Sequence, residues 1–247
     1  MRAVIMAGGR GTRLAPYTTI LPKPLMPIGD MPILEVVIRQ LHLAGVEAVT
    51  LAVGHLASLL MAYFGDGSAF GIPITYSVEA VPLGTAGPLG LLEGLEETFL
   101  VLNGDLLTDL DFAAMIAAHQ DAKADATVGV FRREVRIDLG VVEEDGFGHI
   151  ARYIEKPTHQ FLVSMGIYVF EPSVLRHLPV GERCDLPALI EALLSSSCAV
   201  LSYRHEGYWL DIGRPDDYQV AQGEFDRLRD RLLGPTRRSA GAAPETA

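Results

Sequence analysis

A glycine-rich loop near the start of the chain has the residue types of a phosphate-binding site. Residues 6–13 read MAGGRGTR and follow a short apolar segment, residues 3–6, that is typical of a buried β-strand. Because glycine lacks a Cβ atom, the backbone N–H groups of such a loop can approach an anion closely. Arg13 adds a planar charged group, and Lys23 follows between two prolines. This opening segment therefore predicts a site for a polyphosphate.

Two commoner nucleotide-binding loops do not fit this segment. A dinucleotide fingerprint requires glycine at the sixth place counted from Gly9, where this chain has Leu14. A P-loop ends in Gly-Lys followed by serine or threonine, and no lysine precedes Lys23. The remaining alternative to a ligand-binding loop is a glycine-rich turn that serves only chain geometry.

Two aspartates at the ends of separate strand-like segments predict a magnesium site. Asp105 follows residues 99–102, and Asp211 ends the segment YWLD. Ligands of open α/β sheets bind at the carboxyl ends of strands, and Mg²⁺ prefers one or two carboxylates together with phosphate oxygens. The structural alternatives are a turn or helix cap for Asp105, and a cap for the helix near Pro215 for Asp211. The histidines have no zinc-binding spacing.

Three further segments carry candidate ligand-binding residues. Lys156 ends another strand-like segment and can hold a second phosphate, or it is an edge-strand lysine before a turn. Gly140 would let a bulky ligand lie against the backbone. Residues 82–87 read PLGTAG and are expected to open a helix whose N-terminus faces the ligand. Glu79 lies just before them.

The composition excludes several classes of protein. With 247 residues, 49% hydrophobic and 21% charged, the chain suffices for one large α/β domain. A net charge of −11 argues against general binding to nucleic acid or anionic membranes, and no apolar run could span a membrane. Met1 leads directly into the first strand, and the two cysteines have no metal or redox spacing. We therefore expect a cytoplasmic protein without signal peptide, nucleic-acid partner or membrane partner.

Strands and amphipathic helices alternate over the first half of the chain, which predicts parallel strands joined by right-handed crossovers. After residue 125 the strands follow one another more closely, which predicts a mixed extension of the same sheet that carries a substrate. The expected strands are residues 49–53, 74–78, 99–102, 126–131, 139–143, 150–154 and 163–170. The expected helices are residues 33–44, 56–64, 112–122 with Asp111 as N-cap, 186–194 and 215–233.

Together these motifs resemble those of the sugar nucleotidyltransferases (sugar-1-phosphate nucleotidylyltransferases). The resemblance rests on AGGRGTR at residues 7–13, PKP at 22–24, LGTAG at 83–87, NGD at 103–105, EKP at 155–157 and WLDIG at 209–213. It covers about residues 1–225 and implies a single Rossmann-like α/β domain with a mixed, mostly parallel central sheet flanked by helices. The chain resembles the short form without a C-terminal β-helix, closest in style to mannose- and heptose-1-phosphate guanylyltransferases. Acetyltransferase or regulatory properties of longer relatives are not implied.

The resemblance also implies roles for individual residues. The expected nucleotide-binding set is Ala7, Gly8, Gly9, Gly11, Thr12, Arg13, Glu79, Gly84 and Thr85, and the sugar-phosphate-binding set is Gly140, Glu155 and Lys156. The expected catalytic set is Arg13, Lys23, Asp105 and Asp211, of which the two aspartates bind Mg²⁺. We expect one domain over residues 1–233, with a nucleotide-binding part (1–125) and a sugar-phosphate-binding part (126–233), and a disordered tail over 234–247.

The implied reaction is magnesium-dependent transfer of a nucleotidyl group from a nucleoside triphosphate to a sugar 1-phosphate, which gives a nucleotide sugar and pyrophosphate. The attacking phosphate oxygen is largely ionised at pH 7, since its second pKa is near ~6, so no general base is required. We expect GTP, because an ionised Glu79 would accept from the adjacent N1–H and 2-amino groups of guanine, and a hexose or heptose 1-phosphate.

Several alternatives to that reaction stay open. One is thymidylyl or uridylyl transfer to glucose 1-phosphate or an amino-sugar 1-phosphate. Another is an inactive nucleotide-sugar sensor on the same fold. A dinucleotide-dependent oxidoreductase is disfavoured by Leu14. The expected assembly is a monomer or a small homo-oligomer.

Overall fold

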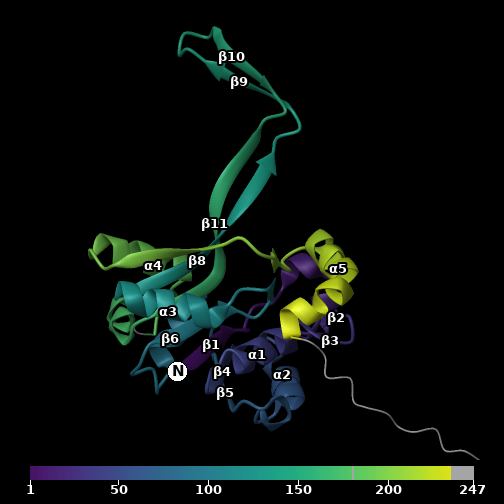
Figure 1. The fold of residues 1–247 in the computed structure, drawn as a ribbon, viewed down its shortest axis with the longest axis vertical. Helices are drawn as coiled ribbons and strands as arrows, with labels where there is room; N and C mark the ends of the chain where they lie inside the picture. Colours follow the sequence, from purple (N-terminus) through teal and green to yellow (C-terminus); the bar gives the residue numbers. More distant parts are fainter. Residues whose placement is uncertain (180, 235–247) are drawn as a thin grey trace, which may run out of the picture.

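A seven-stranded sheet lies at the centre of the molecule, in a computed structural model that describes residues 1–179 and 181–234 (Figure 1). The strand order is β12-β8-β11-β6-β1-β4-β5, and neighbours are parallel except that β11 is antiparallel to both β6 and β8. The strands are β1 (Arg2–Met6), β4 (Ala48–Val53), β5 (Ile74–Val78), β6 (Phe99–Asn103), β8 (Ala126–Arg136), β11 (Thr158–Phe170) and β12 (Val200–His205). This architecture confirms the predicted mixed, mostly parallel sheet.

Helices cover both faces of this sheet, because successive side chains of its buried strands point to opposite sides. Ala3 and Ile5 of β1 belong to the core beneath α1, α2 and α3, whereas Val4 belongs to the core beneath α4. A third cluster lies under α5, where Phe225 packs near Leu14. The helices are α1 (Ile33–Leu43), α2 (Ala57–Phe64), α3 (Phe112–Ala122), α4 (Leu186–Ser195) and α5 (Pro215–Leu233).

The ends of the helices follow from local sequence signals. The Asp111 carboxylate accepts a hydrogen bond of 2.9 Å from the N–H of Ala114, which confirms its predicted role as N-cap of α3. Glycines at positive φ follow α1 and α2, with φ of 81° at Gly45 and 53° at Gly65. Pro215 occupies the first turn of α5, where its missing N–H costs nothing.

Three short strand pairs and several short 3₁₀ segments complete the fold. The strand pairs are β2 (Pro27–Ile28) with β3 (Met31–Pro32), β7 (Leu106–Thr108) with β13 (Trp209–Asp211), and β9 (Gly140–Glu144) with β10 (Ile150–Glu155). The 3₁₀ segments are η1 (Thr12–Leu14), η2 (Tyr17–Thr19), η3 (Lys23–Leu25), η4 (Ser68–Phe70), η5 (Gly87–Leu91) and η6 (Pro172–His177). No helix in the described ranges is long and apolar enough to cross a membrane.

The sequence-based prediction of a helix that opens at residues 82–87 was wrong. In the structure these residues form an irregular loop, followed by the short 3₁₀ segment η5. Pro88, Gly90 and Gly94 explain the difference, since proline and glycine are the two residues least favourable to an α-helix interior. The predicted tail over 234–247 lies, apart from its first residue, outside the described residues.

A second difference from the prediction is that β8 and β11 extend beyond the expected strands and form an arm, residues 132–162, that projects from the sheet (Figure 1). It consists of the outer parts of β8 and β11, and the pair β9–β10 forms its far end. The flanking strands do not follow it: β12 pairs with β8 only as far as Phe131, and β6 pairs with β11 only from Ile167. Because β8 is parallel to β6, the arm leaves the sheet at the edge where β1 and β6 end.

Candidate active site

A cavity of about 430 Å³ opens at the carboxyl ends of β1 and β6, within the size range of small-molecule sites. All of the residues predicted to form the catalytic and nucleotide-binding sets line it. They come from the glycine-rich loop, the loop before η5, the end of β6 and the end of β13. The fold therefore brings together segments that are up to about two hundred residues apart in the sequence.

Local packing and backbone conformation explain two glycines of the glycine-rich loop, Gly8 and Gly11, but not Gly9. Gly11 has φ of 61°, and a Cβ atom on Gly8 would lie 3.1 Å from the Glu79 carboxylate, so both positions favour glycine for structural reasons. A Cβ atom on Gly9 would meet nothing within 4 Å. Within the described residues, the N–H groups of Gly9 and Arg10 donate no hydrogen bond. Gly9 thus leaves an open backbone surface beside the cavity, as an anion-binding loop requires.

We expect Gly9→Ala to weaken nucleotide binding without weakening the fold. The added methyl group meets no protein atom, but it occupies the space through which a phosphate would reach the loop. Crowding of this kind costs about 1–3 kcal/mol, so the KM for the nucleoside triphosphate should rise roughly tenfold while the melting temperature stays unchanged. Gly90→Ala is the matched control. Its added Cβ atom would lie no closer than 4.0 Å to the neighbouring atoms of Leu178, and Gly90 does not line the cavity. An equal KM in both variants would show that the loop serves chain geometry only.

Asp105 and Lys23 form an ion pair at the floor of the cavity. The Lys23 ammonium contacts Oδ2 of Asp105, and the two side chains are 9% and 23% exposed. Lys23 opens η3, and the prolines on either side of it, Pro22 and Pro24, fix the backbone there. Oδ1 of Asp105 is buried and has no hydrogen-bond partner among the described residues. Asp105 precedes the strand β7 and not a helix, so the helix-cap alternative for it does not apply.

Asp211 lies close enough to Asp105 for the two charges to interact. Burial raises the pKa of Asp211 above its usual value, and the neighbouring Asp105 carboxylate raises it further, whereas Lys23 and Arg13 oppose the shift. A Cβ atom on Gly213 would lie 3.3 Å from the Arg13 guanidinium and from Asp211 Oδ1, so these two groups converge there. No side chain caps α5, which removes the helix-cap alternative for Asp211.

The pairing of β7 with β13 fixes the two carboxylates relative to each other. Asp211 is opposite Leu106, the residue after Asp105, and the N–H of Ile212 donates to the Asp105 carbonyl at 3.0 Å. Asp109, which follows β7, also connects the two strands. Its carboxylate accepts a hydrogen bond from the N–H of Tyr208, which precedes β13, and forms an ion pair with Arg231 of α5. The site thus rests on hydrogen-bonded backbone and not on a free loop.

This arrangement fits a magnesium ion better than a zinc ion. Asp105 has a buried oxygen without a hydrogen-bond partner among the described residues, and burial disfavours the charged form of the neighbouring Asp211. A hard divalent cation would stabilise both carboxylates. Within the described ranges, no group of three or more histidine, cysteine, aspartate or glutamate side chains could hold a metal. Two carboxylates suffice for Mg²⁺, which takes its other ligands from water and phosphate oxygens.

Another part of the cavity wall joins the loop before η5 to the start of α4. Asp185 Oδ1 accepts from the N–H of Thr85 at 3.0 Å, and the Thr85 hydroxyl accepts from the N–H of Leu186 at 2.8 Å. Gly84 has φ of 83°, and a Cβ atom there would lie 2.5 Å from the Cys184 carbonyl. Gly84 is therefore required for this close packing, whatever its contact with a ligand.

Glu79 lines the cavity directly after β5. Its Oε2 atom accepts a hydrogen bond of 2.9 Å from the N–H of Leu83, so its position is fixed by its own loop. Glu79 also borders an adjoining hollow of about 340 Å³, which it shares with Gly8, Gly9 and Pro82. One carboxylate oxygen is thus engaged, and the other is directed toward Gly8.

Two cavity-lining charges escaped the sequence analysis. Arg183 and Asp185 flank Cys184 just before α4, and Arg183 pairs with Asp185 at 3.4 Å. They belong to no motif and follow no strand, so the strand-end argument that identified Asp105 could not identify them. The signal that was available is positional: helix starts carry unpaired N–H groups and attract ligands.

The predicted sugar-phosphate residues do not join the cavity in this structure. Gly140, Glu155 and Lys156 lie on the arm, and none of them lines the cavity. Lys156 has φ of 46° at the turn between β10 and β11, and its ammonium is 3.9 Å from Glu155. Gly140 is needed because the Tyr153 ring covers it: a Cβ atom there would overlap the Tyr153 hydroxyl. Their proposed contact with a sugar phosphate stays a prediction.

Comparisons with known proteins found a matching family model and several similar proteins. Residues 2–226 match the family model described as nucleotidyl transferase. A mannose-1-phosphate guanylyltransferase of Mycobacterium tuberculosis is 35% identical, with 96% of this chain and 67% of that protein covered. A UTP–glucose-1-phosphate uridylyltransferase of Synechocystis is 35% identical, with 92% and 64% covered. This chain therefore spans about two thirds of the length of these curated relatives.

The solved structures include proteins of the same fold. The crystal structure of HddC from Yersinia pseudotuberculosis superposes with a TM-score of 0.69 and 24% identity, covering 91% of this chain and 99% of that one. A similarity at this level of identity bears on the fold alone, and it agrees with the mixed sheet described above.

Proposed function

The chain belongs to the nucleotidyl transferase family, and from that membership we propose that it transfers a nucleotidyl group from a nucleoside triphosphate to a sugar 1-phosphate, with Mg²⁺ as cofactor. One observation carries the proposal. A single cavity brings together two carboxylates and two cations, Asp105, Asp211, Lys23 and Arg13. The glycine loop beside them has backbone N–H groups that donate no hydrogen bond within the described residues. That set is suited to holding a triphosphate and to offsetting charge that moves to a leaving pyrophosphate.

In the proposed mechanism, the protein positions two anions and neutralises their charge. The glycine loop, Arg13 and Lys23 bind the triphosphate. Mg²⁺ held by Asp105 and Asp211 would lower the charge on the phosphate oxygens around the reacting phosphorus. The sugar phosphate needs no general base, because its oxygen is already ionised near pH 7. Bringing the two reactants into line supplies much of the rate enhancement.

A turnover assay tests this proposal against an inactive nucleotide sensor. The purified chain is incubated with MgCl₂, each of five nucleoside triphosphates and a panel of hexose and heptose 1-phosphates, and pyrophosphate is measured. The proposal predicts release of pyrophosphate that requires both substrates and stops with EDTA. A protein that binds nucleotide but releases no pyrophosphate with any pair would be a sensor.

For the base we propose a preference for GTP, with uridylyl transfer as the alternative. Glu79 supports this choice, because its free oxygen is an acceptor beside the adjoining hollow, and guanine presents donors on its edge. The guanylyltransferase of Mycobacterium tuberculosis supports it too, whereas the uridylyltransferase of Synechocystis, at the same identity, supports the alternative.

We expect Glu79→Gln to abolish the preference for GTP. The N–H of Leu83 would hold the amide oxygen of the new side chain, which turns its NH₂ group toward the base, where guanine also offers donors. Facing donors cost about 2–3 kcal/mol, so kcat/KM for GTP should fall roughly 30- to 150-fold relative to the other nucleotides. The measurement is the ranking of kcat/KM over GTP, ATP, UTP, dTTP and CTP. A ranking that is the same in both proteins would assign base recognition to backbone groups near Gly84.

For the sugar phosphate we propose Arg183, a third cation that lines the cavity besides Arg13 and Lys23. Arg183→Ala should raise the KM for sugar 1-phosphate by about tenfold or more, the cost of one charged hydrogen bond, and change the KM for the nucleotide less. Lys156→Ala is the companion variant, since the sequence assigns this contact to Lys156. If Lys156→Ala raises that KM and Arg183→Ala does not, the arm reaches the cavity during turnover and the sequence-based assignment is right.

A further inference from the structure

Asp105 and Asp211 lie at one end of a very short strand pair, β7–β13. Each strand has three residues, and the pair forms a small sheet of its own. Asp211 is opposite Leu106 at the cavity end, and Trp209 is opposite Thr108 at the far end. A two-stranded sheet is marginally stable in water unless other elements hold it. The distance between the two carboxylates therefore depends on what holds the far end of this pair.

The carboxylate of Asp109 holds the far end. Asp109 follows β7 directly, and its side chain is only 8% exposed. Its Oδ1 atom accepts hydrogen bonds from the N–H of Tyr208 and, at 2.9 Å, from Nε2 of His205. Its Oδ2 atom contacts the guanidinium group of Arg231. One carboxylate thus joins four elements, which are β7, the end of β12, the start of β13 and α5.

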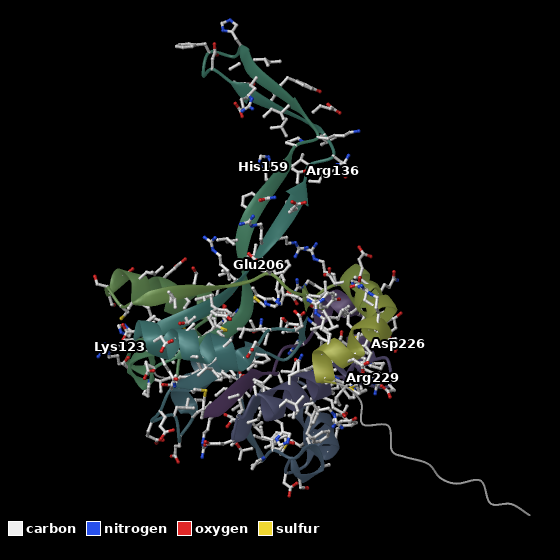
Figure 2. The ribbon with its side chains drawn as sticks, viewed as in Figure 1. Lys123, Arg136, His159, Glu206, Asp226 and Arg229 are labelled. Carbon is white, nitrogen blue, oxygen red and sulfur yellow. The ribbon has the colours of Figure 1, made fainter. Side chains whose placement is uncertain are left out.

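The connection between β12 and β13 is packed closely against this carboxylate. Gly207 lies in the connection, and a Cβ atom there would overlap both Asp109 Oδ1 and the His205 ring. Figure 2 shows Glu206, the residue before Gly207, at the base of the arm. The N–H of Asp109 also donates to the Tyr208 carbonyl at 3.1 Å. The position of Asp109 is therefore determined by its backbone as well as by its side chain.

The last turn of α5 takes part in the same set of contacts. Arg231 lies in this turn, is half-exposed and supplies the cation that contacts Asp109. Gln40 of α1 holds the turn from the other side, because its Nε2 group donates to the Thr108 carbonyl at 2.6 Å and to the Leu232 carbonyl at 3.0 Å. The C-terminal end of α5 is thus attached to β7 by an ion pair and by a shared side-chain amide.

We propose that Asp109, together with Arg231, is a positioning residue for the metal site. It sets the distance between Asp105 and Asp211, and thereby the affinity of these two carboxylates for Mg²⁺. The inference rests on the proposed function, which takes the two aspartates as metal ligands, whereas Asp109 itself does not line the cavity. Mg²⁺ requires near-ideal octahedral geometry, but Ca²⁺ accepts a flexible set of oxygen ligands. A site that loses its spacing should therefore lose affinity for Mg²⁺ more than for Ca²⁺.

The test measures binding of Mn²⁺ by electron paramagnetic resonance, without nucleotide and without turnover. Mn²⁺ takes the same oxygen ligands as Mg²⁺, and its signal reports the free ion. Asp109→Asn keeps an oxygen for the N–H of Tyr208 but loses the charge that Arg231 contacts. It should raise the Mn²⁺ dissociation constant about ten- to a hundredfold, the usual effect of removing a group that holds metal ligands in place. Arg231→Met should act in the same direction, and Arg231→Lys, which keeps the charge, should stay close to the wild type.

Competition with Mg²⁺ and Ca²⁺ separates positioning from a general loss of folded protein. In Asp109→Asn the dissociation constant for Mg²⁺ should rise by a larger factor than that for Ca²⁺, whereas partial unfolding would reduce the occupancy by both ions equally. Arg227→Met is the control and should bind all three ions as the wild type does, because it breaks only an exposed pair with Glu224 on the same helix. Circular dichroism and the melting temperature establish that every variant is folded.

The possible failures of this inference and of the proposed function can be told apart. If Asp109→Asn binds Mn²⁺ as tightly as the wild type, or loses Mg²⁺ and Ca²⁺ by the same factor, Asp109 has no positioning role and the proposed function stands. If the wild type binds no Mn²⁺, or if Asp211→Asn binds it equally well, the metal site itself is wrong, and this inference is overturned together with the magnesium dependence of the proposed function.

Discussion

Replacing Asp211 with asparagine should nearly abolish turnover and at the same time stabilise the protein. Loss of the proposed metal ligand should remove several kcal/mol of transition-state stabilisation, and about 4 kcal/mol lowers kcat about 10³-fold. The folded protein holds this carboxylate at a cost, because burial and the nearby Asp105 charge raise its pKa above the usual value. An aspartate whose pKa is raised on folding opposes folding at pH values above that pKa, so a neutral side chain relieves the cost.

The measurement combines steady-state kinetics with thermal unfolding in buffer without magnesium. We expect a melting temperature that is equal to the wild type or a few degrees higher, at about 2–4 °C per kcal/mol for a chain of this size. Asp216→Asn, in the exposed first turn of α5, is the control and should leave kcat unchanged. A variant at Asp211 that keeps its rate at saturating MgCl₂, or that unfolds many degrees earlier, would make this residue a structural one.

Replacing Lys23 with methionine should reduce both the rate and the stability. Lys23 contacts Asp105 and lowers the pKa of Asp211, so the change removes a cation that both carboxylates need. Breaking a largely buried ion pair costs about 3–5 kcal/mol, although solvent at Asp105 reduces this figure, so we expect a melting temperature lower by roughly 5–10 °C. Loss of a charged contact to the triphosphate should lower kcat/KM by about 10²-fold or more.

A double variant separates the two effects of Lys23. Lys23→Met combined with Asp105→Asn removes both charges, so most of the lost melting temperature should return while the rate stays low. Arg227→Met, which breaks an exposed pair with Glu224 on α5, should change the melting temperature by less than about 2 °C. If the double variant were no more stable than the single one, the ion pair would not be the source of the stability of this region.

The fold of residues 1–125 could be predicted from the sequence because its signals are local. Buried parallel strands are continuous apolar runs, and ligand-binding residues of such sheets follow their carboxyl ends. Asp105 follows β6 directly, so its place in the cavity could be inferred without knowledge of the rest of the fold. The N-cap Asp111 and the glycines after α1 and α2 were equally local signals, and the structure confirms them.

Features that depend on the path of a whole segment could not be predicted. Lys156 and Gly140 could be picked out from the residues around them in the sequence. Their position in space, however, depends on how far β8 and β11 extend, and no local pattern determines that length. Arg183 reaches the cavity only because Asp185 is bonded to Thr85, a hundred residues away in the chain. The sequence showed the glycines before η5 but gave no reason to expect that Gly84 packs against Cys184.

The most direct test of nucleotidyl transfer is to follow the oxygen atoms of the sugar phosphate. The protein is incubated with MgCl₂, GTP and a hexose 1-phosphate whose three non-bridging oxygens are ¹⁸O, and both products are examined by mass spectrometry. Attack of the sugar phosphate on the α-phosphorus predicts a nucleotide sugar that contains all three labelled oxygens and pyrophosphate that contains none. Labelled pyrophosphate, or consumption of GTP without a labelled nucleotide sugar, would contradict the proposed function.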